Sequence, residues 1–293
     1  MRMTPLRLAY SPCPNDTYIF HGWVHGLVPE APPVEEVLAD IDTLNAMALR
    51  EEPDVVKVSF AAFGRLRREY ALLHAGGALG RGCGPLLVAR ADSALLRGGG
   101  DELPMRLAAG RVAVPGELTT AALLLRLFAP QAGSRPVMPF DRIMPAVAGG
   151  EVEAGVVIHE GRFTYPQYGL ECLLDLGEWW ESTTGEALPL GGIAVRRALG
   201  LEVAREVDRA IRGSLEHARR DPGASTAYIR RHAQEMDPRV CREHIALYVN
   251  EFSLDYGEEG ERAIRRLLAV AEAVGVVPPA GGTGLFWDDP GGG

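Results

Sequence analysis

The sequence predicts an α/β protein of two lobes, in which one lobe is inserted into the chain of the other. Short apolar strands alternate with helices along the chain, which is typical of parallel βαβ units in an open sheet. The length of 293 residues corresponds to about two domains of ordinary size. Two similar segments, 84–90 and 191–197, each consist of a glycine, an apolar strand and an arginine, and the chain between them has its own βα pattern.

Two such segments predict that the chain crosses between the lobes twice and forms a double-strand hinge. Lobe one is then 1–90 together with 191–293, and lobe two is 91–190. Proteins built in this way bind their ligands in a cleft between the lobes. We therefore expect the functional residues to come from both lobes.

The first ninety residues contain a strand at 6–10 and a proline-rich loop at 11–16. Each proline keeps its predecessor out of the α-helical region, so Ser11 and Cys13 should be extended. Asn15 or Asp16 can cap a helix that runs from Thr17 towards Val24. The same pattern predicts a helix at 41–49, a strand at 55–58, and a helix at 61–70 that Ser59 caps.

The inserted lobe repeats this alternation, and the chain after residue 197 is predicted to be helical. Lobe two should contain a strand at 111–114, a helix from Thr120 through 128, a helix at 143–148 that ends at two glycines, and a strand at 152–158. Apolar residues then recur every fourth position at 203, 207, 211 and 215, and a second long helix is expected at 258–274. We expect the tail from Pro278 to fray.

Composition excludes several classes of partner. The chain is 47% hydrophobic and 24% charged, as in soluble globular proteins, and its net charge of −9 is spread without long runs of one sign. Clustered cations for a nucleic-acid groove or an anionic membrane are therefore not expected. The four cysteines have no zinc or disulfide spacing, and neither a signal peptide nor a long apolar span is evident. We expect a cytoplasmic protein with a small-molecule substrate, and the sequence leaves open whether it forms a homodimer.

Four polar segments follow predicted strands, where ligands of open α/β sheets bind. They are 14–16, 57–59, 119–120 and 159–162. Each alone could simply be a helix cap, but their convergence indicates a site for a carboxylate or hydroxyl-rich ligand. Lys57 is the only lysine of the chain, and a guanidinium cannot replace its compact charge in a tight pocket.

His159 is the only histidine that ends an apolar strand. An imidazole with a pKa of about 6.5 can accept a proton at neutral pH, although a structural histidine remains the alternative. His21 and His25 lie four residues apart, but an acidic partner and a third ligand are missing, so we expect no metal site. Phosphate-binding glycine loops and a nucleophile elbow are also missing. What remains is cofactor-free acid–base chemistry or simple binding.

Six long motifs are distributed over the chain. They are Ser-Pro-Cys-Pro-Asn-Asp-Thr-Tyr-Ile-Phe at 11–20, Lys-Val-Ser-Phe at 57–60, Gly-Gly-Ala-Leu-Gly-Arg-Gly at 76–82, Pro-Gly-Glu-Leu-Thr-Thr-Ala at 115–121, Ile-His-Glu-Gly-Arg-Phe-Thr-Tyr at 158–165 and Tyr-Val-Asn-Glu-Phe-Ser-Leu at 248–254. These motifs resemble those of the 1,4-dihydroxy-6-naphthoate synthase family, which acts in the futalosine route to menaquinone. The similarity covers roughly residues 6–275.

The resemblance implies a periplasmic-binding-protein-like (type II) fold and a carbon–carbon lyase that needs no cofactor. Such an enzyme splits cyclic dehypoxanthinyl futalosine into 1,4-dihydroxy-6-naphthoate and a sugar-derived fragment. His159 matches the family's proton acceptor. The matching substrate-binding positions are Lys57, Val58, Ser59, Thr119 and Thr120, and Asp16, Asn45 and Arg162 fall in matching motifs as further cleft-lining residues.

Two alternatives to the synthase stay open at this point. Chorismate dehydratase has the same lobes and belongs to the same pathway, but the motifs at 11–16 and 158–160 favour the synthase. A solute-binding protein would need export, for which the sequence has no visible signal.

Gly161 stands where the family often has serine, and this difference could loosen the loop that carries Arg162.

Overall fold

The computed structural model describes residues 4–233 and 237–289 of the chain. The chain forms two compact units, and each is described by itself below. Unit 1 consists of Met1–Gly80 and Pro189–Gly293, and unit 2 consists of Arg81–Leu188.

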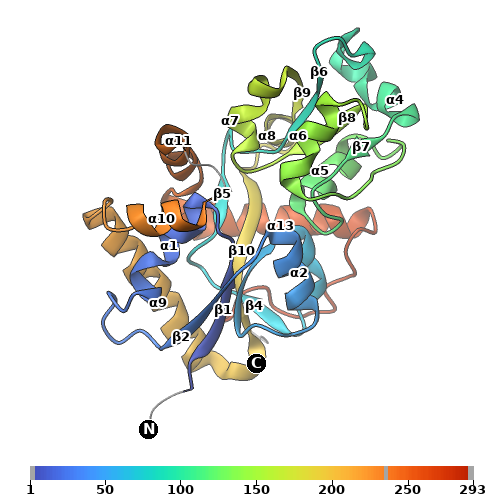
Figure 1. The fold of residues 1–293 in the computed structure, drawn as a ribbon. Helices are drawn as coiled ribbons and strands as arrows, with labels where there is room; N and C mark the ends of the chain where they lie inside the picture. Colours follow the sequence, from blue (N-terminus) through green and yellow to red (C-terminus); the bar gives the residue numbers. More distant parts are fainter. Residues whose placement is uncertain (1–3, 234–236, 290–293) are drawn as a thin grey trace. The chain divides into compact units, whose positions relative to one another are not determined.

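Unit 1 is built on a mixed sheet with the strand order β2-β1-β3-β10-β4, and β5 pairs with β10 (Figure 1). β1 runs parallel to β2 and β3, as the βαβ pattern predicts, whereas β10 runs antiparallel to β3 and β4. The prediction of parallel strands is wrong for β10, because this strand returns from the inserted unit. The strands are β1 (Leu6–Tyr10), β2 (Val34–Leu38), β3 (Val55–Ser59), β4 (Tyr70–Leu72), β5 (Ala78–Gly80) and β10 (Leu188–Arg196).

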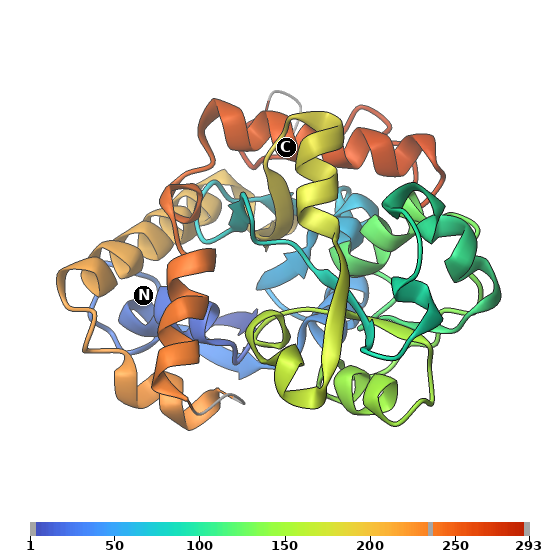
Figure 2. The same cartoon turned by 90° about the horizontal axis from the view of Figure 1, so that it is seen from above.

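The helices of unit 1 form two groups. α1 packs against α9, α10 and α11, which lie beside it in both Figure 1 and Figure 2, and α3 packs against α2 and α13. The predicted apolar stripe of α9 is confirmed, since Val207, Ile211 and Leu215 are buried in the core with β1. The helices are α1 (Pro14–Val24), α2 (Ile41–Leu49), α3 (Phe60–Leu66), α9 (Gly200–Arg220), α10 (Thr226–His232), α11 (Pro238–Tyr248), α12 (Glu251–Leu254) and α13 (Gly257–Ala273).

Two predicted helix boundaries in unit 1 are wrong. α1 begins at Pro14 rather than Thr17, and its N-cap is Cys13 rather than Asn15 or Asp16. Proline suits the first helical position, because its fixed φ is already helical and its missing N–H is not needed there. α3 ends at Leu66 instead of residue 70, since the following residues form β4 and pair with β10.

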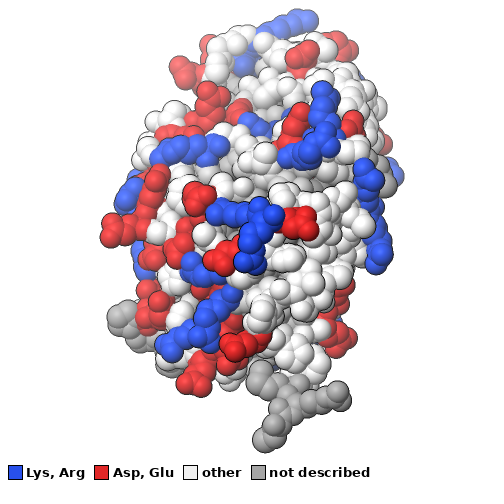
Figure 3. Space-filling model, turned by 90° about the vertical axis from the view of Figure 1, so that its left-hand side faces the viewer, with Lys and Arg blue, Asp and Glu red and all other residues white. Residues whose placement is uncertain are grey.

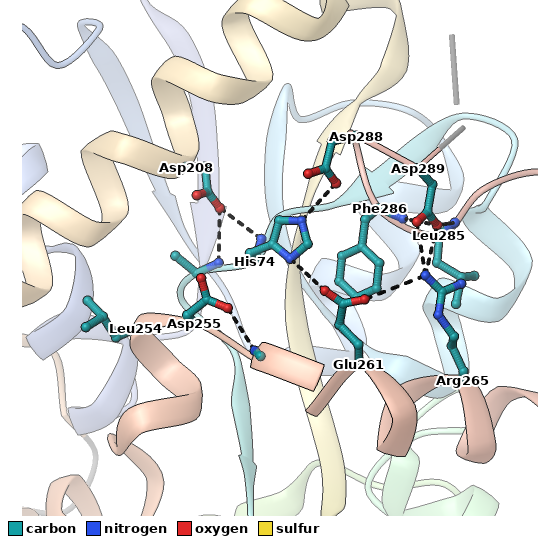
Figure 4. A network of polar contacts seen from close by, with 12 residues as sticks. His74, Asp208, Leu254, Asp255, Glu261, Arg265, Leu285, Phe286, Asp288 and Asp289 are labelled. Atoms are coloured by element: carbon teal, nitrogen blue, oxygen red, sulfur yellow. Dashed lines mark hydrogen bonds and ion pairs between the residues drawn. The ribbon is translucent and has the colours of Figure 1, made fainter. Parts of the chain in front are cut away.

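The described part of the tail, 278–289, does not fray as expected, because Leu285 and Phe286 are buried. The expectation for 290–293 lies outside the described residues. Phe286 is fully buried and forms a parallel bridge with Leu72 beside β4. Asp289 accepts hydrogen bonds from the main-chain N–H groups of Leu285 and Phe286 and pairs with Arg265 (Figure 4). Burial of aromatic surface and the closed hydrogen bonds together hold the segment in place.

His74 connects this tail to the rest of unit 1. Its ring stacks on Phe286 with centroids 4.6 Å apart. Nε2 lies 2.8 Å from a carboxylate oxygen of Asp288, and Nδ1 lies 3.4 Å from one of Glu261 on α13 (Figure 4). The ring is thus held between an acid of the tail and an acid of a neighbouring helix.

Unit 2 contains a four-stranded sheet in the order β7-β8-β6-β9. β7 is parallel to β8, and β6 is antiparallel to both β8 and β9. The elements predicted at 111–114, 120–128, 143–148 and 152–158 are all present with small shifts of their ends. The unit consists of β6 (Leu86–Arg90), α4 (Leu103–Arg106), β7 (Val112–Ala113), α5 (Thr120–Phe128), α6 (Phe140–Ala148), β8 (Ala154–Val157), α7 (Gly161–Thr164), β9 (Leu170–Asp175) and α8 (Leu176–Thr184), with short 3-10 turns between them.

The two segments that were predicted to form the hinge lie in different sheets. β6, which the sequence assigned to lobe one, pairs through Leu86 and Val88 with strands of unit 2. β10 pairs through Gly191–Val195 with β3 of unit 1. The chain therefore passes between the units before β6, at residues 80–81, and again at 188–189.

The surface carries both signs of charge. Arginines and acidic residues are interspersed over the face drawn in Figure 3. Many of them pair, as Arg212 does with Asp208 and Asp255. Across 4–233 and 237–289, no helix combines the length and the apolar character that a membrane span requires.

Candidate active site

In unit 1, the turn between β1 and α1 buries a carboxylate. Asp16 is 2% exposed and lies in the first turn of α1. Its Oδ2 accepts a hydrogen bond from Ser11 Oγ at 2.8 Å, and its Oδ1 accepts one from Asn15 Nδ2 at 2.8 Å. A buried carboxylate is costly unless hydrogen bonds and an opposite charge compensate for the lost water. The neighbouring strand β3 supplies that charge.

Lys57 lies in β3 and is 5% exposed. Its Nζ donates to Asp16 Oδ1 at 2.7 Å and lies 3.5 Å from the main-chain oxygen of Gly76. The adjacent strand β10 has a glycine, Gly191, next to the lysine side chain. A Cβ on Gly191 would lie 3.3 Å from Lys57 Cε and 2.8 Å from the main-chain oxygen of Val58, so the glycine leaves room for the lysine. The only lysine of the chain is therefore one half of a buried ion pair, and a direct contact with substrate stays a prediction.

Ser59 ends β3 and is held by Asn45 of α2 through two hydrogen bonds. Asn45 Nδ2 donates to Ser59 Oγ at 2.9 Å, and the main-chain N–H of Ser59 donates to Asn45 Oδ1 at 3.0 Å. This pairing fixes the orientation of the serine hydroxyl and assigns Asn45 a supporting role. The side chain of Val58 is fully buried, so the predicted binding role of Val58 would depend on its main chain.

The sequence analysis missed His244, which joins this network from α11. Its Nε2 lies 2.9 Å from Asn15 Oδ1, and Asn15 in turn donates to Asp16. The two residues are 229 positions apart, and no local pattern marks the histidine. A hydrogen-bonded chain thus runs from His244 through Asn15 and Asp16 to Lys57.

The loop that carries Gly76 is closed by the motif at 248–254. The main-chain N–H of Gly76 donates to the Ser253 oxygen at 2.7 Å, and Ser253 Oγ donates to the Gly77 oxygen at 2.9 Å. Asn250 Nδ2 donates to the Leu79 oxygen at 2.9 Å. A Cβ on Gly77 would lie 2.0 Å from the hydroxyl oxygen of Tyr256, so this glycine permits the close approach. The motifs at 76–82 and 248–254 therefore meet in space.

In unit 2, Thr119 and Thr120 stand at the start of α5, and both are buried. Thr119 is the N-cap: its Oγ1 accepts from the main-chain N–H of Ala122 at 3.2 Å and donates to the Gly116 oxygen at 2.8 Å. The helix-cap alternative is therefore correct for the Thr119 side chain. Contact of either threonine with a ligand stays a prediction.

His159 follows β8 after one intervening residue and has a left-handed backbone with φ of +54°. Its ring packs edge-on against Phe140 of α6 at a centroid distance of 5.1 Å. The strand ends here because the chain turns: the N–H groups of Gly161 and Arg162 donate to the oxygens of Ile158 and His159. A non-glycine residue in this conformation carries backbone strain, which is found preferentially at functional sites.

Arg162 ties the His159 turn to the rest of unit 2. Its guanidinium donates to the Gly84 oxygen at 2.7 Å and to Asp175 Oδ2 at 2.6 Å. Asp175 Oδ1 caps α8 by accepting from the N–H groups of Gly177 and Glu178. The side chain predicted to line a cleft therefore links three segments of its own unit, and a substrate contact of Arg162 stays a prediction.

The thiols of unit 2 are not poised for nucleophilic attack. Burial raises the pKa of Cys83 to about 12. Burial also raises the pKa of Cys172, to which the nearby Asp175 contributes. Because the thiolate is the reactive form, neither side chain acts as a nucleophile near neutral pH.

His21 lies in the last turn of α1, and His25 is the C-cap of this helix. Their rings lie 4.4 Å apart, but His25 Nδ1 is 2.9 Å from the main-chain oxygen of His21 and is used there. Among the residues of unit 1 that the structure describes, no three His, Cys, Asp or Glu side chains bring ligand atoms close enough to hold an ion.

Comparisons with known proteins identify the family of this chain. The family model described as menaquinone biosynthesis matches residues 6–273, which is most of the sequence. The chain belongs to the menaquinone biosynthesis family. The resemblance that the sequence motifs indicate is thereby confirmed.

Two curated relatives of this menaquinone biosynthesis protein are named 1,4-dihydroxy-6-naphthoate synthase. The enzyme of Streptomyces coelicolor is 51% identical over 286 residues, covering 96% of this chain and 98% of the relative. The enzyme of Thermus thermophilus is 51% identical over 279 residues, covering 95% and 98%. Both relatives are thus matched over almost their whole length.

Solved structures confirm the predicted fold. A protein of Archaeoglobus fulgidus is 37% identical and superposes with a TM-score of 0.85, with 93% of this chain and 98% of that chain covered. The alkanesulfonate-binding protein SsuA from Xanthomonas axonopodis has a TM-score of 0.69 at 13% identity, with 96% of each chain covered. The second likeness concerns the fold alone, which is periplasmic-binding-protein-like.

Proposed function

We propose that this menaquinone biosynthesis protein is a lyase that converts cyclic dehypoxanthinyl futalosine to 1,4-dihydroxy-6-naphthoate without a cofactor. The observation that carries the proposal is the 51% identity, over almost the full length, to two enzymes named for that product. Chorismate dehydratase and a solute-binding protein remain the alternatives, and the fold is common to solute-binding proteins such as SsuA.

In the proposed reaction His159 is the general base. An imidazole nitrogen takes the acidic proton next to the substrate carbonyl, and the electron pair of the broken C–H bond moves onto the carbonyl oxygen. The electrons then return to expel an oxygen leaving group, which takes up a proton. Cleavage of the carbon–carbon bond to the sugar-derived fragment and aromatisation of the new ring complete the reaction. A positioned base contributes about 10²–10⁴-fold to such a step.

The remaining predicted residues are proposed to hold the substrate. We assign binding to Ser59, Thr119, Thr120 and the segment Lys57–Val58, whose hydroxyls, amides and charge suit a carboxylate or hydroxyl-rich ligand. A donor that is aimed at the developing oxyanion contributes about 10²–10³-fold. Asp16, Asn45 and Arg162 are proposed to support these groups, in line with their hydrogen bonds to Lys57, Ser59 and Gly84.

The test is turnover by the purified protein. Cyclic dehypoxanthinyl futalosine is added, and naphthoate absorbance is followed for the wild type and for His159→Asn. We expect the substitution to lower turnover by at least about a hundredfold. Calorimetric titration should show nearly unchanged substrate affinity, because asparagine keeps a polar side chain of similar reach.

A matched control separates loss of the base from a general effect of replacing a histidine. His232→Asn, on α10 of unit 1, should turn over substrate like the wild type. Near-normal turnover of His159→Asn would remove His159 from the mechanism. Dehydration of chorismate, or tight binding of either compound without any product, would reject the synthase activity in favour of one of the two alternatives.

A further inference from the structure

Glu160, next to His159, is a buried acid with an unsatisfied oxygen. It is 6% exposed, and within the described part of the chain its Oε2 has no hydrogen-bond partner. Buried carboxylates are normally hydrogen-bonded or paired with a cation, since the charge otherwise loses its hydration without replacement. An acid left in this state calls for a functional explanation.

The charged groups on the surrounding elements are engaged elsewhere or exposed. Arg162 donates to Gly84 and Asp175. Tyr165 and Cys172 stay neutral near pH 7, because burial raises the pKa of each. The other charged groups on elements packed against β8 are paired or exposed. Arg90 of β6 pairs with Asp92, and Arg126 of α5 pairs with Glu117. Asp141 and Arg142 of α6 are exposed.

His159 lies beside this carboxylate. A ring nitrogen of His159 and a carboxylate oxygen of Glu160 lie within 4.8 Å of one another. At such a separation a charge on one group is felt strongly by the other.

The main chain keeps the two side chains together. The main-chain oxygen of Glu160 accepts hydrogen bonds from the N–H group of Phe163 at 2.9 Å and from Thr164 Oγ1 at 3.1 Å. His159 precedes Glu160 directly and has a left-handed backbone, and the ends of the two side chains lie close to one another. The pair is therefore a fixed feature of the turn after β8.

We propose that Glu160 is a positioning residue for the base: its carboxylate stabilises the protonated form of His159. The proposal rests on the proposed function only in so far as His159 is the base of that reaction. When the ring takes a proton from the substrate carbon, a positive charge appears beside a carboxylate for which the described part of the chain supplies no other cation partner. The proton stays on the imidazole ring.

The test measures the His159 titration directly. Protein carrying ¹³C-labelled histidine is titrated by NMR, and the His159 signal is identified by its absence from His159→Asn. In Glu160→Gln we expect the midpoint of this titration to fall by about one pH unit or more, which is the usual effect of removing an opposite charge at this distance. Glu178→Gln, an exposed acid on α8, is the matched control and should leave the midpoint unchanged.

Turnover supplies a second readout. The acidic limb of the kcat profile should move to lower pH in Glu160→Gln, and kcat at its plateau should fall by up to about tenfold, because each pH unit is a tenfold change in proton affinity. A residue with a merely structural role would leave the limb in place. Should Glu160→Gln fold poorly, Glu160→Asp keeps the charge, and the midpoint of the His159 titration in this variant should stay close to that of the wild type.

The two failures are distinguishable. An unchanged His159 midpoint in folded Glu160→Gln would overturn the role of Glu160, whatever the reaction. If the wild type forms no naphthoate, the proposed function fails, but a shifted midpoint would still support the pairing of Glu160 with His159.

Discussion

Replacement of Asp16 by asparagine should test how the buried charges of unit 1 are held. The carboxylate accepts hydrogen bonds from Ser11, Asn15 and Lys57, so each of these three partners is a donor. An asparagine has one acceptor oxygen in place of two and carries no charge. In Asp16→Asn, Lys57 Nζ therefore keeps only neutral acceptors, such as the main-chain oxygen of Gly76 at 3.5 Å.

The magnitude follows from the separation and burial of the pair. At 2.7 Å the Coulomb attraction between Lys57 and Asp16 is about 6 kcal/mol for an effective dielectric constant of about 20. This attraction is an upper limit to the net stabilisation by the pair, because burying the two charges costs free energy. Removing one partner of a buried pair costs about 3–5 kcal/mol, because the other charge stays buried without compensation. We expect Asp16→Asn to lower the free energy of unfolding by this amount, and the melting temperature by about 10 °C.

Thermal unfolding of the variants, followed by circular dichroism, checks this expectation. The double variant Asp16→Asn with Lys57→Met removes both charges and should recover a large part of the loss. Glu251→Gln breaks the exposed pair with Arg219 and should cost less than about 1 kcal/mol. A loss of under about 1 kcal/mol in Asp16→Asn, or a double variant whose loss is the sum of the two single losses, would refute the reasoning.

Two further predictions concern pH and close packing. Burial, together with His25 and His217, lowers the pKa of His21, so the folded state favours its neutral ring. Its contribution to stability is therefore complete above about pH 6.5 and is lost as the pH falls below that value. Between pH 6.5 and 5, the free energy of unfolding of His21→Phe should fall less steeply than that of the wild type, by up to about 1.4 kcal/mol per pH unit. Equal slopes for the two proteins would contradict this. Gly84→Ala should lower the stability of the protein by about 1–3 kcal/mol in thermal melts, because its Cβ would lie 2.3 Å from the Gly177 backbone, whereas Gly99→Ala meets nothing within 4 Å and should be neutral.

Local pattern was sufficient for much of the fold. The strand at Leu6–Tyr10, the helix at Ile41–Leu49 and the βα elements of unit 2 follow from the apolar pattern of the sequence. The antiparallel direction of β10 relative to β3 and β4 could not be predicted in this way. It depends on where the chain re-enters unit 1 after the inserted unit. The tail was misjudged because Phe286 and Asp289 find their partners in β4 and α13, which no local window contains.

The site shows the same division. Strand ends indicated His159, Ser59 and Lys57 as candidates, since a polar residue after an apolar strand is a local signal. His244 was missed because its partner Asn15 is distant in sequence. Glu160 stands in the same polar segment as His159, and what distinguishes it is burial with an unsatisfied oxygen, a property of the folded turn that the sequence does not display.

The hydrogen bonds divide the predicted site residues into two classes that experiments can separate. Asp16 and Arg162 bond to groups of the protein itself, so their loss should first appear in stability. His159 carries backbone strain that packing must offset, which is a reason to expect a function for its ring rather than a structural role. A network that is satisfied before substrate arrives keeps Ser59 and Lys57 in place, so less binding energy is lost in ordering them. Variants of the supporting class should therefore retain turnover in proportion to their folded fraction, whereas variants of His159 should lose turnover while they remain folded.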